Sequence, residues 1–176
     1  MRIITGEMSG QMIDFPKGLS LRPTMDFAKE GLFNILNHRY DLTKFKVLEL
    51  FAGSGSVSFE FISNQVRQVT AVDNNFKVIN HLKSTAQKMN ISNIDVVKSD
   101  VLKFLSQLWN TYDIIFGDPP YDYSHYQKIV SLVFERNLLN NNGLLILEHD
   151  RKVRFDQLEN FQEERSYGKT AFSFFT

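Results

Sequence analysis

From residue 46 onward, short apolar runs alternate with longer amphipathic segments, and no other feature of the chain restricts its fold as strongly. Strands and helices that take turns along a chain build a mostly parallel sheet with helices on its faces. The sequence therefore predicts a doubly wound, Rossmann-like α/β fold. The expected strands are residues 46–51, 68–73, 94–99, 112–117 and 143–148.

The segments between these strands have the apolar periodicity of helices. The expected helices are residues 56–63, 75–89, 101–108 and 124–137. The polar stretch 140–143 is expected to be a turn. In residues 165–176 a turn at Gly168 precedes an aromatic run, which predicts a terminal antiparallel hairpin. The hairpin brings the expected sheet to seven strands.

Residues 1–45 differ in character and are expected to form an N-terminal extension, ahead of a main domain at residues 46–176. Apolar pairs at residues 3–4 and 12–13 flank a turn that contains glycine, so a small β-hairpin is expected there. Thr24 is the expected N-cap of a helix that follows the hairpin and runs to about residue 39.

Composition excludes several classes of protein. With 176 residues, 43% of them hydrophobic and 23% charged, the chain fits one soluble globular domain. It has no cysteine, which excludes disulfides and thiolate metal sites, and its four histidines show no metal-ligand spacing. No apolar stretch approaches the length of a membrane span, so a cytoplasmic location is expected. Twenty basic and twenty acidic residues argue against a large, purely electrostatic nucleic-acid surface.

Glycines and an acid follow the first predicted strand, in the sequence Glu-Leu-Phe-Ala-Gly-Ser-Gly at residues 49–55. The glycines allow close approach of a ligand, and Asp73, twenty residues past Gly53, is spaced for a carboxylate that binds ribose hydroxyls. The pattern indicates a site for an adenosine-containing cofactor. Glu49 favours the cationic S-adenosylmethionine over a dinucleotide, whose pyrophosphate prefers a helix N-terminus without nearby acids. Ser58 also stands where the third glycine of the dinucleotide fingerprint would be.

The predicted strand 112–117 stops in an Asp-Pro-Pro-Tyr turn at residues 118–121. Two adjacent prolines fix two φ angles and remove two backbone donors, so carbonyl oxygens of the turn are expected to face outward without partners. Asp118 and the ring of Tyr121 complete a pocket for a planar group that carries an amino nitrogen, such as a nucleobase or an amide.

Each feature also has a purely structural interpretation. The glycines could make a tight turn, Asp73 and Asp100 could each cap the next helix, and the prolines could simply end a strand. Capping does not explain why such groups stand at four strand ends together. A ligand site does, because open α/β sheets bind ligands at the carboxyl edge. Asp100, which follows the third strand, is in position to accept from an adenine amino group.

The glycine loop and the Asp-Pro-Pro-Tyr turn together resemble the class I S-adenosylmethionine-dependent methyltransferases that modify exocyclic or amide nitrogens. Four further motifs narrow the resemblance: Arg-Ile-Ile-Thr-Gly at residues 2–6, Leu-Arg-Pro-Thr-Met-Asp at 21–26, Glu-Gly-Leu-Phe-Asn at 30–34 and Tyr-Gly-Lys-Thr at 167–170. With them the chain resembles, over essentially its whole length, the RsmD-type bacterial 16S rRNA guanine-N2 methyltransferases.

This resemblance implies methyl transfer from S-adenosylmethionine to the exocyclic N2 of a guanine, without a metal. The implied catalytic residues are Asp118, Pro119, Pro120 and Tyr121, of which Tyr121 also stacks on the base; Arg22 and Thr24 are the other implied substrate-binding residues. The implied cofactor residues are Glu49, Phe51, Ala52, Gly53, Ser54, Gly55, Asp73, Asn74, Asp100 and Val101.

The resemblance further implies a cytoplasmic monomer without membrane contact, whose partner is 16S rRNA or an assembly intermediate of the small ribosomal subunit. Residues 46–176 are then the methyltransferase domain. Two departures concern RNA contact. Residues 7–11, Glu-Met-Ser-Gly-Gln, have no basic side chain where the family usually has a basic cluster, and Phe27 stands where it usually has a basic residue.

Three alternatives stay open at this point. An amino methyltransferase acting on DNA or on a protein glutamine shares the acid or amide, Pro-Pro, aromatic turn. A non-catalytic RNA-binding module for ribosome assembly could keep the fold without the reaction. A nicotinamide-dependent oxidoreductase would differ in its choice of cofactor.

Overall fold

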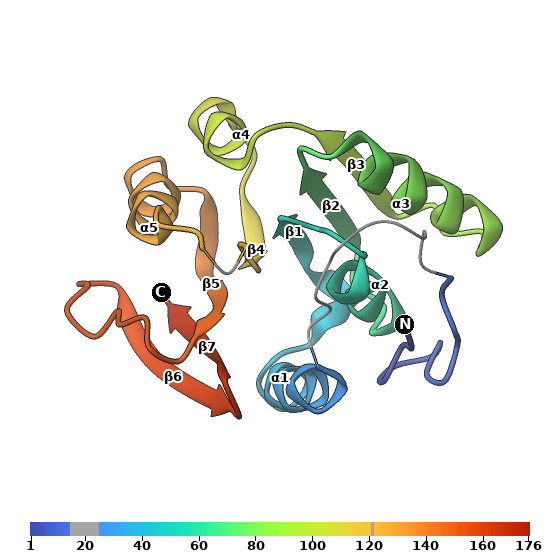
Figure 1. The fold of residues 1–176 in the computed structure, drawn as a ribbon, viewed down its shortest axis with the longest axis horizontal. Coiled ribbons are helices and arrows are strands. Elements are labelled where there is room, and N and C mark those ends of the chain that lie inside the picture. The colour runs from blue at the N-terminus through green and yellow to red at the C-terminus, as the bar shows by residue number, and fades with distance from the viewer. Residues whose placement is uncertain (15–24, 121) are drawn as a thin grey trace.

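A computed structural model describes residues 1–14, 25–120 and 122–176 of the chain (Figure 1). The strands are β1 (Lys46–Leu50), β2 (Gln68–Asp73), β3 (Ile94–Lys98), β4 (Tyr112–Gly117), β5 (Leu139–Asp150), β6 (Phe161–Tyr167) and β7 (Thr170–Phe175). They form one sheet in the order β3-β2-β1-β4-β5-β7-β6. Strands β1 to β5 are parallel, whereas β7 runs antiparallel to both β5 and β6. The predicted fold class is confirmed, including the antiparallel C-terminal hairpin.

Helices cover both faces of the sheet (Figure 1). They are α1 (Asp26–Arg39), α2 (Ser56–Ser63), α3 (Phe76–Lys88), α4 (Val101–Gln107) and α5 (Tyr126–Glu135), with a short 3₁₀ helix at Leu42–Lys44. Side chains of α4 and α5 pack against one face, whereas α1 and α2 pack against the other. Successive β4 residues follow this division, since Ile115 joins the first cluster while Ile114 and Phe116 join the second. Burial on both faces explains why the central strands are mostly apolar, with Glu49 of β1 as a buried exception.

The N-terminal segment, residues 1–14, packs against α2 and α3 and is only partly the expected hairpin. Its backbone makes one isolated antiparallel bridge, between Arg2 and Met12, and forms no strand. Ile3 and Ile13 are nonetheless buried, in a third apolar cluster with Val78 and Leu82 of α3. Apolar contact with the helices therefore helps to hold the segment in place, together with hydrogen bonds from its backbone to Glu60 and Ser63 of α2.

Two predicted boundaries are wrong. Helix α1 begins at Asp26, and its N-cap is Met25, which makes no side-chain cap; Thr24, the predicted cap, lies outside the described residues. The predicted turn at residues 140–143 lies inside the longer strand β5, where the register with β4 shifts and Asn142 has a φ of 62°. A bulge absorbs extra residues without ending the ladder, and the polar composition of the stretch did not distinguish the two cases.

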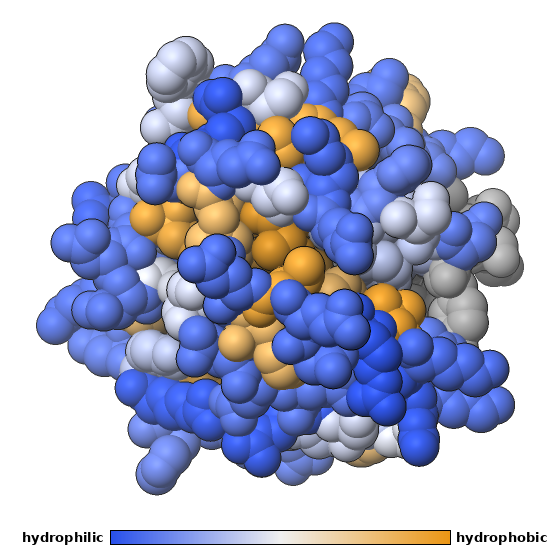
Figure 2. Space-filling model, turned by 90° about the vertical axis from the view of Figure 1, so that its left-hand side faces the viewer, coloured by the Kyte–Doolittle hydropathy of each residue, from blue (hydrophilic) through white to orange (hydrophobic). Residues whose placement is uncertain are grey.

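The side of the molecule that carries α5 and β6 is mostly hydrophilic, with hydrophobic side chains gathered near its middle (Figure 2). Among the described residues, no helix combines the length and the apolar character needed to cross a membrane.

Candidate active site

The link from β1 to α2 has a backbone that few residue types tolerate. Gly55, the N-cap of α2, has a φ of 75°, and a Cβ there would lie 2.4 Å from a methyl carbon of Leu82. Phe51 also has a positive φ, 59°, although it is not glycine, and its ring meets that of Tyr123 edge-on at 5.1 Å. Non-glycine residues in this region carry strain of about 1–3 kcal/mol and are concentrated at functional sites.

This link borders a cavity of about 570 Å³ at the carboxyl edge of the sheet, a volume within the usual range for small-molecule sites. Its walls come from the ends of β1, β2, β4 and β5 and from the helices that follow them. The lining residues are Met25, Glu49, Phe51, Ala52, Gly53, Ser54, Ser56, Val57, Asp73, Asn74, Asn75, Val78, Val101, Asp118, Pro119, Pro120, Tyr123, Tyr126, Glu148, His149, Asp150 and Thr170.

Asp73 ties the glycine loop to the start of α3. One oxygen of its carboxylate accepts from the N–H of Gly53 at 2.9 Å, and the other accepts from the N–H of Asn75 at 2.8 Å. The side chain that caps α3 is that of Asn75, which accepts from the N–H of Lys77 at 2.9 Å. Asp73 holds the loop with these two hydrogen bonds. Because each carboxylate oxygen has further lone pairs, it can also accept hydrogen bonds from the hydroxyl groups of a ligand in the cavity.

Glu49 is a buried carboxyl that faces the same cavity, and it accepts from the hydroxyl of Ser58. Burial raises its pKa to about 8, and the nearby charge of Asp73 acts in the same direction. At neutral pH the free protein therefore keeps this carboxyl mostly protonated. A cation in the cavity favours the ionised form, because opposite charges lower a carboxyl pKa.

The residues present fit S-adenosylmethionine. Ser56 Oγ is buried in the cavity wall and has no hydrogen-bond partner among the described residues, so a ligand with a polar group fits there. Glu49 and Asp73 supply acids for an ammonium or sulfonium group and for hydroxyls, while Val78 and Val101 supply apolar wall. Five acids line the cavity, which disfavours a pyrophosphate; they are Glu49, Asp73, Asp118, Glu148 and Asp150.

The Asp-Pro-Pro turn lies at the same cavity, with Asp118, Pro119 and Pro120 in its wall. The carbonyl of Pro120 accepts from the N–H of Tyr123 at 2.8 Å, so the expectation that the turn's carbonyls lack partners is wrong for this one. The same bond places Tyr123 in the wall, beside Phe51. Tyr121 lies outside the described residues.

The end of β5 forms the wall beyond this turn. Burial raises the pKa of Tyr126 to about 12, and the charges of Asp118, Glu148 and Asp150 add to the shift, so its hydroxyl stays protonated. His149 is buried, with Nδ1 2.8 Å from the carbonyl of Asp150 and Nε2 2.8 Å from Ser173 Oγ. Burial lowers the His149 pKa, so its ring is neutral at physiological pH.

Most of the expected site residues lie in the cavity wall. They are Glu49, Phe51, Ala52, Gly53, Ser54, Asp73, Asn74, Val101, Asp118, Pro119 and Pro120. Gly55 shapes the loop without lining the cavity, and Arg22 and Thr24 lie outside the described residues. Asp100 is exposed and caps α4, accepting from the N–H of Lys103 at 2.9 Å. Its charge nevertheless adds to the burial that raises the pKa of Tyr123.

Sequence reasoning missed the wall built by Ser56, Tyr126, Glu148, His149 and Asp150. A signal for the last three was present. Glu148 ends the fifth predicted strand, and His149 and Asp150 follow it directly. The rule that ligands bind at the carboxyl ends of parallel strands applies to that strand as well. Tyr126 and Ser56 lie in helices, and no local pattern separates them from residues that face the core or the solvent.

Comparison with known proteins gives concordant results. The family model described as conserved hypothetical protein 95 matches residues 1–176. A protein named ribosomal RNA small subunit methyltransferase D from Haemophilus influenzae is 35% identical over 155 residues, 86% of this chain and 79% of that protein. A protein of the same name from Buchnera aphidicola subsp. Baizongia pistaciae is 30% identical over 153 residues, 87% of this chain and 78% of that protein.

Solved structures match the fold over the whole chain. A hypothetical protein of Thermus thermophilus superposes with a TM-score of 0.86 and 25% identity, covering 99% of this chain and 98% of that one. The ribosomal protein L11 methylase of Lactobacillus delbrueckii subsp. bulgaricus has a TM-score of 0.71 at 16% identity, over 96% of this chain and 86% of that one, which is a similarity of fold alone.

Proposed function

Since the chain belongs to the conserved hypothetical protein 95 family, with relatives named ribosomal RNA small subunit methyltransferase D, we propose that it methylates the exocyclic N2 of a guanine in small-subunit rRNA. S-adenosylmethionine is the methyl donor. One observation supports this function above the others: a single cavity joins the glycine loop and Asp73 to the Asp-Pro-Pro turn. A donor site and an acceptor site for a methyl group thus share one space.

Residues on the β1 and β2 side hold the donor. The carboxylate of Asp73 accepts the ribose hydroxyls, and Val101 lies against the adenine with Asp100 near the rim. Glu49, the loop at Gly53 and the hydroxyl of Ser56 face the methionine end. S-adenosylmethionine, when bound, supplies an electrophilic methyl group.

Residues of the turn after β4 position the acceptor. A guanine amino nitrogen is a weak nucleophile, because its lone pair is delocalised into the ring. Hydrogen bonds from the amino group to Asp118 and to the Pro119 carbonyl draw this nitrogen toward tetrahedral geometry and orient its lone pair. The nitrogen–carbon bond forms as the sulfur–carbon bond breaks, and the nitrogen then loses one proton, for which Asp118 is the adjacent acceptor. Orientation of this kind contributes up to roughly 7–11 kcal/mol in favourable cases.

The remaining parts of the proposal concern the surroundings of the reaction. The chain acts in the cytoplasm as a monomer, on 16S rRNA or on an assembly intermediate of the small subunit. Tyr121 is the proposed stacking partner of the base, and Arg22 and Thr24 are the other proposed substrate-binding residues; all three lie outside the described residues. The target base must be unpaired or drawn out of its helix to reach a cavity of this depth.

The test is transfer of labelled methyl from S-adenosylmethionine to small subunits, or to their 16S rRNA, taken from a strain that lacks this protein. Nucleoside analysis should detect N2-methylguanosine and no methylated adenine or cytosine. Transfer of the label to DNA or to a protein glutamine instead of rRNA would refute the proposal. Tight NAD binding without S-adenosylmethionine binding would refute it as well.

Two variants separate the halves of the site. Asp118→Ala should lower turnover by about 10²–10⁴-fold while cofactor affinity measured by calorimetry stays nearly constant. Asp73→Ala should instead weaken the cofactor, since it removes both the ribose acceptor and the partner of Gly53. Equal loss of binding and turnover in Asp118→Ala would mean that Asp118 is structural.

A further inference from the structure

A second acid lies beside Asp118, on the next strand of the sheet. The register between β4 and β5 pairs Phe116 with Ile146 and Gly117 with Leu147. Continued by one residue, it places Asp118 next to Glu148. Side chains alternate along strands, and neighbouring strands lie about 4.8 Å apart. Glu148 lies within β5 and therefore projects from the same face as Ile146. Asp118 follows directly on β4, with its N–H 3.4 Å from the carbonyl of Leu50.

Glu148 is buried, 7% exposed, and lines the cavity together with Asp118. The two acids act on a common neighbour, since the charges of both raise the pKa of Tyr126. The acids assigned to the cofactor, Glu49 and Asp73, belong to β1 and β2, on the other side of β4 in the sheet order. Glu148 therefore lies in the acceptor half of the cavity. The proposed methyl transfer, in which Asp118 takes the proton, does not require a second acid there.

The nucleobases differ in what stands beside their amino group. Adenine and cytosine carry the amino group next to an unprotonated ring nitrogen, which is an acceptor. Guanine carries it between an unprotonated ring nitrogen, N3, and a protonated one, N1–H, so on the N1 side its edge offers two adjacent donors. A carboxylate is acceptor-only and can take both donors at once, whereas it faces a lone pair in the other two bases.

We propose that Glu148 selects guanine, by accepting a hydrogen bond from N1–H and one from the amino hydrogen nearer to N1. Asp118 and the Pro119 carbonyl then accept at the remaining amino hydrogen, from which the proton leaves. The inference rests on the proposed function and names the group that decides which base that function accepts. A base that places an acceptor against the buried Glu148 carboxylate sets two lone pairs against each other and forms neither hydrogen bond, which is how sites built on hydrogen bonds reject analogues strongly.

The test uses rRNA with guanine or 2-aminopurine at the target position, once nucleoside analysis has mapped it. 2-Aminopurine keeps the amino group but has an unprotonated N1. The wild type should prefer guanine by at least about 100-fold in kcat/KM, a comparison that needs no variant. Comparable rates on the two substrates would overturn the inference.

Glu148→Gln should then change the preference rather than only the rate. Its amide can donate to the N1 of 2-aminopurine but opposes the N1–H of guanine. The kcat/KM of the variant on guanine should therefore fall by about 30-fold or more, and its preference for guanine over 2-aminopurine should narrow or reverse. Equal loss on both substrates would assign Glu148 a merely structural role. Glu159→Gln, at an exposed position outside the cavity, is the matched control and should leave both rates unchanged.

If Glu148→Gln does not fold, judged by thermal melting and by S-adenosylmethionine affinity, Glu148→Asp replaces it. That variant keeps the carboxylate and should retain the preference for guanine at a reduced rate; loss of the preference would count against the inference. The two hypotheses fail separately. No N2-methylguanosine from the wild type defeats the proposed function, whereas N2-methylguanosine without discrimination against 2-aminopurine defeats only the role of Glu148.

Discussion

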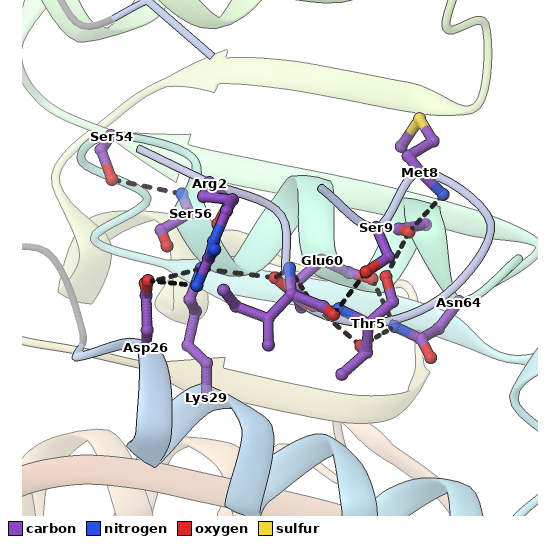
Figure 3. A network of polar contacts seen from close by, with 12 residues as sticks. Arg2, Thr5, Met8, Ser9, Asp26, Lys29, Ser54, Ser56, Glu60 and Asn64 are labelled. Atoms are coloured by element: carbon purple, nitrogen blue, oxygen red, sulfur yellow. Dashed lines mark hydrogen bonds and ion pairs between the residues drawn. The ribbon is translucent and has the colours of Figure 1, made fainter. Parts of the chain in front are cut away.

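Two buried glutamates, Glu60 on α2 and Glu49 on β1, belong to regions that use a carboxylate in opposite ways. Glu60 accepts from the backbone N–H groups of Ile4 and Thr5 and from the Thr5 hydroxyl, and it forms an ion pair with Lys29 (Figure 3). Glu49 accepts from one hydroxyl and meets no cationic side chain among the described residues. The first carboxylate is satisfied within the fold, and the second faces a cavity.

The Glu60 network connects three parts of the chain. Lys29 of α1 lies 3.3 Å from Glu60 and donates to the carbonyl of Arg2 at 3.0 Å. Both charged side chains are almost inaccessible, at 1% and 0% exposure. The N-terminal segment, α1 and α2 therefore meet at one buried ion pair.

The contrast shows how a buried acid can be assigned a role. Placing a carboxylate out of water is expensive unless donors and a cation compensate it. Where the fold supplies them, as around Glu60, the acid stabilises the fold. Where the described residues bring no cation to the acid and a cavity adjoins it, as at Glu49, burial raises the pKa in spite of the donors of Ser58, and the acid is suited to a cationic ligand.

The largest expected effect comes from breaking the satisfied pair. Glu60→Gln leaves Lys29 buried without its anion and should lower the free energy of unfolding by about 3–5 kcal/mol, measured by urea denaturation. Combining it with Lys29→Met should recover part of the loss, because no unpaired charge then remains. Cofactor affinity of the folded variant should not change. A loss below about 1 kcal/mol would show that the network contributes little.

Glu49→Gln should have the reverse profile. It removes the anion that meets the cationic end of the cofactor, and affinity measured by calorimetry should fall by about 10–100-fold, or about 1.4–2.7 kcal/mol. Stability without ligand should rise at pH 8, by at least about 2 °C in melting temperature, since the variant has no carboxyl to ionise in a buried site. Equal stability and unchanged affinity would remove the distinction between the two glutamates.

The pH dependence of the wild type tests the same assignment. The folded pKa of Glu49, about 8, lies above its ordinary value of 4.5, so the native state binds more protons than the unfolded one between these limits. Ligand-free stability should therefore fall as the pH rises from about 5 to 8 through this group. Cofactor affinity should rise between pH 6 and 8, by at most about tenfold per unit, because binding favours the ionised form. In Glu49→Gln, both the pH dependence of stability and the pH dependence of cofactor affinity should become weaker.

The smallest effect is expected at the exposed edge of the Glu60 network. Arg2 and Asp26 lie 3.6 Å apart, and both side chains are more than half exposed. Asp26→Asn should lower the free energy of unfolding by less than about 1 kcal/mol, and the loss should shrink further in 1 M salt. A loss as large as that of Glu60→Gln would mean that exposure does not separate these two parts of the network.

Much of the fold and half of the site could be predicted from local patterns. Apolar runs located β1, β2 and β4 because a strand buried on both faces must be apolar throughout. Glycines, Asp73 and the Asp-Pro-Pro turn could be read as site residues, because the carboxyl ends of parallel strands meet at one edge. The bulge in β5 and the start of α1 at Asp26 could not be predicted from the sequence, because polar residues occur in turns, bulges and caps alike.

The sequence by itself thus determined the alternating order of strands and helices, the glycine loop after β1 and the rigid turn after β4. Each of these depends on the chemistry of neighbouring residues. Only the tertiary structure decided that Lys29 meets Glu60 and that Asp118 and Glu148 each follow directly on the paired residues Gly117 and Leu147. The first pairing depends on how α1 packs against α2, and the second on the register between β4 and β5, and neither is encoded in any short segment of the chain.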